Sequence, residues 1–243
     1  MRAYKFLAAG GAGRFSGFDW PVPAGDEPAA WVSAEGSLAV CVNGLHACRV
    51  ENLLDWIDDE LWEAELEGEV TEEAAMVVGQ RGRLVRRVEG WDAPTASALA
   101  DACAWRAREI AVRAFRRDGL AIDADRLAAA DDLIDMQIVS ALASKRPEAS
   151  ASTATAAAFA ADAVALARGQ RPETWDLAIA LAEPAPVQTP AATAANLAFV
   201  VAHAAGLDAV VEAGDEAAYA SGFATERAWQ LGWLTEKLAL ADD

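Results

Sequence analysis

Two cysteines and a histidine lie close together in the segment Cys41-Val42-Asn43-Gly44-Leu45-His46-Ala47-Cys48-Arg49. Zinc accepts thiolate and neutral imidazole readily, because both are strong donors to a borderline-soft cation. With the third cysteine, Cys103, the chain could form a Cys3His zinc site from Cys41, His46, Cys48 and Cys103. The spacing is unusual for this purpose, since structural zinc sites mostly place paired cysteines two to four positions apart. Cysteines that pack as small apolar core residues are the more common alternative.

The same segment could instead bind an anionic small molecule. His46 follows a turn predicted at Asn43-Gly44 and could act as an acid or base near neutral pH. Arg49 could hold a phosphate or carboxylate group. A histidine satisfied by backbone carbonyls is more common, and no partner for a catalytic triad can be named. The residues of this hypothetical nucleotide-type pocket are Lys5, Asn43, His46, Arg49 and Arg83.

The first 92 residues carry the pattern of a β-rich module. In Leu61–Val70 apolar side chains alternate with glutamates, which predicts a strand with one exposed acidic face. The arginines of the next predicted strand region, Met76–Val88, are expected to pair with these glutamates across the sheet, and a basic anion-binding patch is the alternative. The other predicted elements are strands at Ala3–Ala9, Trp31–Val32 and Ser37–Val42, and helical turns at Glu51–Ile57.

From Pro94 onward the chain is rich in alanine and has helical periodicity. Thr189 before Pro190 is a strong helix start, because threonine caps a helix and proline suits its first position. Helices are predicted over residues 94–117, 123–144, 151–168, 173–181, 190–211 and 215–240. We therefore predict an α+β protein in which a β-rich N-terminal module, residues 1–92, packs on an Ala-rich C-terminal helical bundle, residues 93–243.

The composition narrows the choice of partners. The formal net charge is −18, and the acidic residues are spread over the whole chain. Such a surface repels phosphate backbones, so we expect no nucleic-acid partner. The most apolar stretch, Ala192–Val211, contains polar residues and much alanine, which favours a buried helix over a membrane span. An odd number of cysteines argues against a disulfide scaffold, and we expect a cytoplasmic protein.

Several motifs resemble known sequences. The segments Tyr4-Lys5-Phe6, Gly17-Phe18-x-Trp20-Pro21, Asn43–Cys48 and Leu61-Trp62-x-x-x-Leu66 together resemble an uncharacterised actinobacterial family, over about the first 90 residues. Gly44-Leu45-His46-Ala47-Cys48 is also similar to the Gly-Phe-His-Ala-Cys motif of short phage and bacterial proteins. Glu226-Arg227-x-Trp229-Gln230 is similar to the final helix of some proteins linked to bacterial immunity. These resemblances imply a partner-binding helical module and transfer no catalytic role.

Two functions follow as hypotheses. The first is a cytoplasmic binding protein with a protein partner, linked to bacterial conflict or immunity systems. The second is a small-ligand or nucleotide-handling enzyme with an anion-binding pocket around His46 and Arg49. An enzyme requires a concave pocket with converging polar groups at His46, whereas a binding module exposes an apolar patch.

Overall fold

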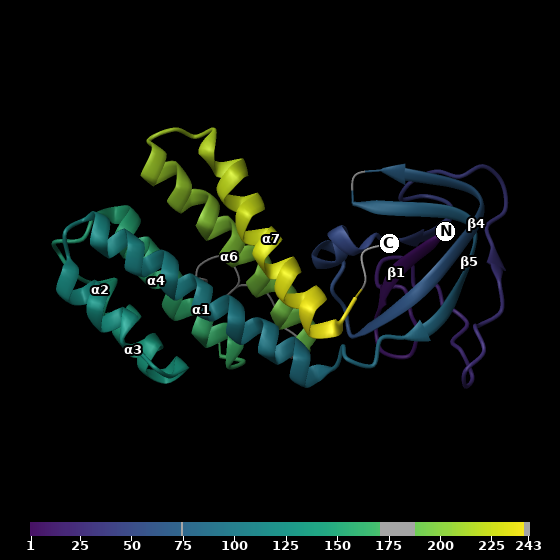
Figure 1. Cartoon of the computed structure of the whole chain (residues 1–243), viewed down its shortest axis with the longest axis horizontal. Coiled ribbons are helices and arrows are strands. Elements are labelled where there is room, and N and C mark those ends of the chain that lie inside the picture. The colour runs from purple at the N-terminus through teal and green to yellow at the C-terminus, as the bar shows by residue number, and fades with distance from the viewer. Residues whose placement is uncertain (74, 171–187, 241–243) are drawn as a thin grey trace, which may run out of the picture. The chain divides into compact units, whose positions relative to one another are not determined.

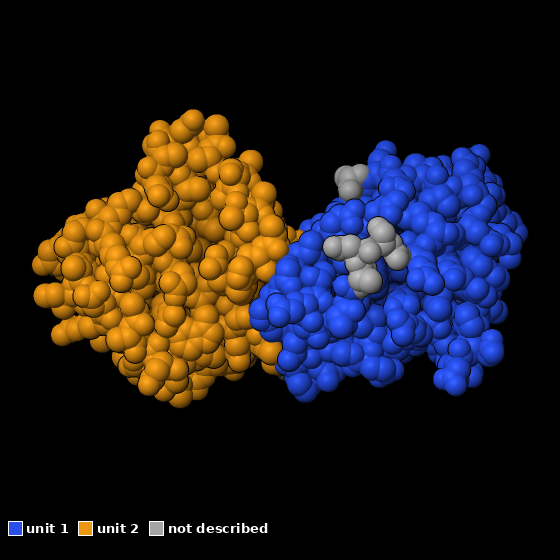
Figure 2. All heavy atoms as spheres, in the orientation of Figure 1, with its two compact units in different colours: residues 1–95, 231–243 blue, residues 96–230 orange. Residues whose placement is uncertain are grey.

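The computed structural model describes residues 1–73, 75–170 and 188–240. The chain divides into two compact units, shown in Figure 2. Unit 1 comprises Met1–Thr95 and Leu231–Asp243, and unit 2 comprises Ala96–Gln230. Antiparallel strands occupy the N-terminal part and helices follow, which confirms the predicted α+β class (Figure 1).

Unit 1 contains one antiparallel sheet that closes on itself. Strand β1 (Arg2–Leu7) pairs with β4 (Glu60–Glu73), and β4 pairs with β5 (Met76–Arg87). The short strands β2 (Val32–Ser33) and β3 (Leu45–Ala47) both pair with β5. Directly after β3, Cys48 and Tyr4 exchange two backbone hydrogen bonds of 2.8 Å, which connects β3 back to β1. The result is a small barrel-like sheet, with a 3-10 helix at Val50–Asp55.

In β4, apolar side chains that face the inside of the sheet alternate with glutamates that face outward. Trp62, Ala64 and Leu66 are buried on the inner face. The glutamates between them point outward and pair with arginines of β5, as predicted, because residues opposite each other on one face of a sheet are in reach. These ion pairs are Glu63–Arg86, Glu65–Arg83 and Glu67–Arg81, and Glu60 at the start of β4 also pairs with Arg87.

One local prediction in unit 1 is wrong. Ser37–Val42 forms bends and a turn instead of a strand, because the N–H groups of Val42 and Asn43 both donate to the carbonyl of Ala39. Cys41 in this turn has a left-handed backbone with a φ of 62°. Gly79 does not interrupt the strand at Met76–Arg87. A Cβ on Gly79 would lie 2.9 Å from Leu66 Cβ, so the glycine allows the two strands to approach.

Unit 2 is helical, and most of its predicted helices are confirmed. They are α1 (Ala93–Arg117), α2 (Ala121–Ala128), α3 (Leu133–Ala143), α4 (Ala151–Ala167), α6 (Pro190–Ala213) and α7 (Ala218–Leu238); α1 begins and α7 ends among the residues of unit 1. Thr189 caps α6 by accepting a hydrogen bond from the Ala192 N–H, as predicted. The helix predicted over 173–181 lies outside the described residues.

The single helix predicted over 123–144 is wrong, because the chain breaks it into α2 and α3. Asp132 is extended, with φ −133° and ψ 163°, and its carboxylate accepts a hydrogen bond of 2.8 Å from the Asp135 N–H. Aspartate is a favoured helix N-cap because it satisfies a backbone donor that has no helical partner. Asp132 therefore begins a new helix.

Helix α6 is the one helix of the described residues that is long and apolar enough to cross a membrane by length and composition. Leu197, Val201 and Ala202 on it are buried within the protein. Asp208 near its C-terminal end is also buried and pairs with Arg113 and Arg117 of α1. Helix α6 therefore has a buried side within unit 2 that includes a paired charge.

Candidate functional site

His46 holds the turn that precedes it. Its Nε2 accepts a hydrogen bond of 3.0 Å from the Cys41 N–H, so the proton lies on Nδ1, which is 2.9 Å from the carbonyl oxygen of Gly44. Gly44 has a φ of 132°, and a Cβ there would lie 2.3 Å from Val78. Both ring nitrogens of His46 are therefore engaged within the loop.

The pKa of His46 is lowered from its ordinary value of 6.5, chiefly by burial. The unfolded chain thus binds the proton more readily, so the stability from neutral His46 is complete above pH 6.5 and is lost as the pH falls through the lowered pKa.

We expect His46→Ala to lower the free energy of unfolding by about 1–2 kcal/mol at pH 8, because two hydrogen bonds are lost. In urea unfolding, the difference from wild type should shrink at pH 5. A difference that stays constant between these pH values would contradict this prediction.

The four residues of the hypothetical zinc site do not form a metal centre in the structure. Across residues 1–73, 75–170 and 188–240, no group of three or more His, Cys, Asp or Glu is placed to hold a metal ion. Cys41 is exposed, and Cys48 is buried in unit 1. Cys103 belongs to unit 2, where it is buried. Burial raises the pKa of both Cys48 and Cys103 to about 12, which favours thiols over the thiolates that zinc needs.

The predicted anion-binding arginines are already paired with carboxylates. Arg49 forms a two-pronged ion pair with Glu72, and Arg83 donates hydrogen bonds of 2.8 and 2.6 Å to Glu65. The Asn43 amide donates to the carbonyls of Glu35 and Ser37 at 2.8 and 2.9 Å, so it closes its own loop. The side chains of Arg49, Arg83 and Asn43 are thus engaged in local hydrogen bonds and ion pairs. They do not point together at a common site where a phosphate could bind.

Lys5 points to the inside of the sheet, away from the outward arginine Arg83. Its Nζ lies 5.8 Å from the centre of the Trp20 ring, and burial lowers its pKa. Burial also raises the pKa of Asp58, and the hydrogen bond from the Asp59 N–H opposes this rise more than the charge of Lys5 does. Asp58 Oδ2 is buried with no hydrogen-bond partner in the described part of the chain. Lys5 is therefore a largely buried amine in the sheet interior, and it does not join Arg83 in one anion site.

Helix α3 exposes a row of large apolar side chains. Ile134, Ile138 and Leu142 follow one another at every fourth position of α3, and their exposed fractions are 51%, 54% and 67%. Residues four apart lie on one face of a helix, so these side chains form a continuous apolar row about 12 Å long. We call it the α3 stripe. Met136 and Ser140 of the same helix are fully buried, so α3 is packed into the unit on its other side.

An exposed apolar residue and three exposed aspartates lie next to the α3 stripe. Arg146 donates to Asp123 at 2.9 Å, which holds the start of α2 near the last turn of α3. Ile122 on that start is 71% exposed. Near the N-terminal end of the stripe, three aspartates are exposed, and no ion pair of theirs occurs among the residues that the structure describes: Asp131, Asp132 and Asp135. Sequence reasoning missed this surface, although the apolar residues at every fourth position and the three nearby aspartates are visible in the sequence.

Comparison of the chain with protein-family models, curated proteins and solved structures found no match. The class that the fold defines is an α+β protein with a closed antiparallel sheet in one unit and a helical second unit.

Proposed function

We propose that the protein is a cytoplasmic interaction protein that binds a protein partner through the α3 stripe. The observation that carries the proposal is the row of three large apolar side chains, each at least half exposed. Exposed apolar patches of this kind mark interaction sites, because covering them removes apolar area from water. Side chains aligned along a helix also match the way helices pack on each other, through ridges and grooves.

The partner segment that fits best is an amphipathic helix with an apolar face and lysine or arginine near one end. The apolar face would cover Ile134, Ile138 and Leu142. The basic residues would meet the exposed aspartates near the N-terminal end of the stripe, and the chain as a whole carries a charge of −18. Such complementarity accelerates encounter and sets orientation, and it weakens as salt screens the charges.

The alternative of an anion-binding enzyme has less support. His46 lines neither the cleft on the outer face of the sheet in unit 1 nor the groove between α1, α6 and α7 in unit 2. Both ring nitrogens of His46, and the guanidinium groups of Arg49 and Arg83, already have partners. A link to bacterial conflict or immunity systems is the context we propose, on the strength of the resemblance of Glu226–Gln230 to the final helix of proteins from those systems.

The proposal is tested with a synthetic helical peptide of leucine and lysine, labelled for fluorescence anisotropy, against the full chain. We expect saturable binding that weakens with added salt. Ile138→Asp should reduce the affinity at least about tenfold, because it puts a charge in the middle of the apolar contact. Asp135→Asn should reduce it by a smaller factor and lower the salt dependence.

Val42→Asp is the matched control, because Val42 is 83% exposed but lies in unit 1. It should bind the peptide like wild type. Equal binding by wild type and Ile138→Asp would overturn the proposal, as would equally strong binding of a leucine–glutamate peptide. Sedimentation of the unliganded chain provides a second test. A dimer that Ile138→Asp converts to monomer would mean that a second copy covers the stripe, and would also overturn the proposal.

A further inference from the structure

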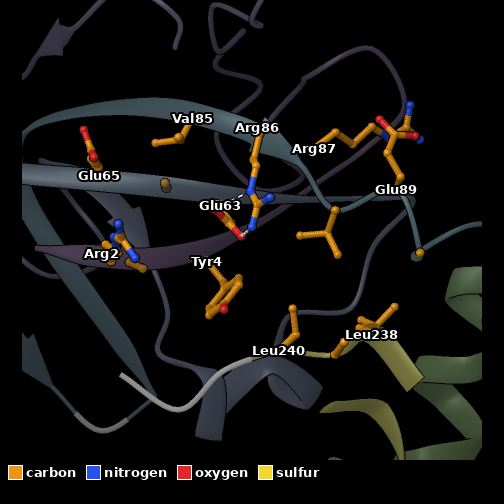
Figure 3. Close-up of a pocket in the computed structure, with 15 residues that line it drawn as sticks. Arg2, Tyr4, Glu63, Glu65, Val85, Arg86, Arg87, Glu89, Leu238 and Leu240 are labelled. Atoms are coloured by element: carbon orange, nitrogen blue, oxygen red, sulfur yellow. Dashed lines mark hydrogen bonds and ion pairs between the residues drawn. The ribbon is translucent and has the colours of Figure 1, made fainter. Parts of the chain in front are cut away.

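A cleft of about 570 Å³ lies on the outer face of the sheet in unit 1 (Figure 3). This volume is in the range of small-molecule sites, roughly 300–1,000 Å³. Its lining comes from β1, β4 and β5, from the turn after β5, and from the residues around the end of α7. All of these residues belong to unit 1, so the cleft is a feature of a single compact body.

The middle of the cleft combines a polar wall and an apolar wall. Arg86 donates to both carboxylate oxygens of Glu63, with Nε at 2.8 Å, and this pair faces the ring of Tyr4 in Figure 3. Leu238 and Leu240 line the opposite side. A ligand in the cleft would thus contact leucine and tyrosine side chains with its apolar part, while the Arg86–Glu63 pair presents no net charge.

Two charged residues of the cleft, one of each sign, have no ion-pair partner among the described residues. Glu65, which lies opposite Arg2 in the strand register, is paired with Arg83. Arg86 is neutralised by Glu63, and Arg87 lies 3.8 Å from Glu60. Arg2 and Glu89 are exposed and take part in no ion pair within the described ranges. They lie at opposite ends of the cleft in Figure 3. The cleft therefore offers a guanidinium at one end and a carboxylate at the other.

We propose that this cleft binds a short apolar peptide with free termini, of dipeptide size. Its carboxylate would pair with Arg2, because a guanidinium matches a carboxylate with two parallel hydrogen bonds. Its ammonium group would pair with Glu89. Its side chains would pack on Leu238 and Leu240. A single amino acid carries its ammonium and carboxylate groups on the same α-carbon, whereas a dipeptide separates them and suits charges at opposite ends of a cleft. This site is independent of the α3 stripe.

The test is calorimetric titration of the full chain with Leu-Leu, N-acetyl-Leu-Leu and Leu-Leu-amide. We expect Leu-Leu to bind saturably and each blocked form to bind about tenfold more weakly, as befits one lost charge-assisted hydrogen-bonded pair. Glu89→Gln should bind Leu-Leu and N-acetyl-Leu-Leu equally well, because it can no longer distinguish the ammonium group. Arg2→Gln should likewise lose the preference for Leu-Leu over the amide.

Glu27→Gln is the matched control, since Glu27 is an exposed glutamate that does not line the cleft. It should keep the wild-type preferences, and so should Ile138→Asp, which separates this test from that of the α3 stripe. Absence of saturable Leu-Leu binding would overturn the proposal. So would equal binding of the free and blocked peptides by wild type, or an unchanged preference in both cleft variants.

Discussion

Trp91→Ala is expected to lower the free energy of unfolding by about 3–5 kcal/mol, the usual cost of removing a large buried aromatic side chain. Only 1% of Trp91 is exposed. Its ring meets Phe6 of β1 edge to face at 5.5 Å, and its Nε1 donates a hydrogen bond of 2.8 Å to the backbone carbonyl of Asp58. Truncation would leave a cavity and, in addition, a buried carbonyl without this partner.

Urea unfolding of three variants checks this prediction. Trp91→Phe should cost less than Trp91→Ala, because it keeps the ring contact with Phe6 and loses mainly the hydrogen bond to Asp58. Trp31→Ala is the matched control. Trp31 is only half-buried and stacks on Arg81 and Arg83, which is worth about 0.5–1 kcal/mol. If Trp91→Ala lowered the free energy of unfolding no more than Trp31→Ala, this result would contradict the structure of the unit 1 core.

Gly222→Ala is expected to destabilise the protein by about 2–3 kcal/mol, although alanine normally favours a helix. The reason is the close approach of α6 and α7 in unit 2, where they lie side by side (Figure 1). A Cβ on Gly222 would lie 2.6 Å from Ala209 Cβ and 2.7 Å from the backbone oxygen of Ala205. The backbone atom cannot rotate away, so the helices would have to separate and lose packing contacts.

The same helix provides the control for Gly222. A Cβ on Gly232 meets nothing within 4 Å, so Gly232→Ala should stabilise the protein by up to about 1 kcal/mol, through helix propensity alone. In thermal or urea unfolding, the change in the free energy of unfolding should therefore be negative for Gly222→Ala and positive for Gly232→Ala. Stabilisation by both substitutions would show that α6 and α7 pack less closely than the structure indicates.

Local patterns in the sequence determined the class of the fold and the type of most elements. The alternation in Leu61–Val70 predicted a strand with an acidic face, and the arginines of the following strand were expected to pair with it, which the structure confirms. Thr189 and Pro190 correctly predicted the start of α6. Such signals succeed because alternation, caps and prolines act within a few residues and do not depend on distant parts of the chain.

Predictions from local sequence failed where a short segment is compatible with two different structures. Asp132 could be either an exposed helical residue or an N-cap, and only the packing of α2 and α3 as separate helices decides for the cap. Ser37–Val42 has the composition of a strand, but the described part of the chain offers no strand to pair with along its length, and a turn held by Ala39, Asn43 and His46 forms instead.

The proposed binding surfaces depend on the tertiary structure. The types of Lys5, His46, Arg49 and Arg83 suggested one anion site, but their directions and partners depend on strand register and on glutamates far away in the sequence. Ile134 and Met136 are equally apolar as letters, yet one is 51% exposed and the other is fully buried. Exposure is a property of how helices pack, so the sequence could indicate that this segment is helical and apolar, and only the folded chain could determine which face of α3 remains exposed.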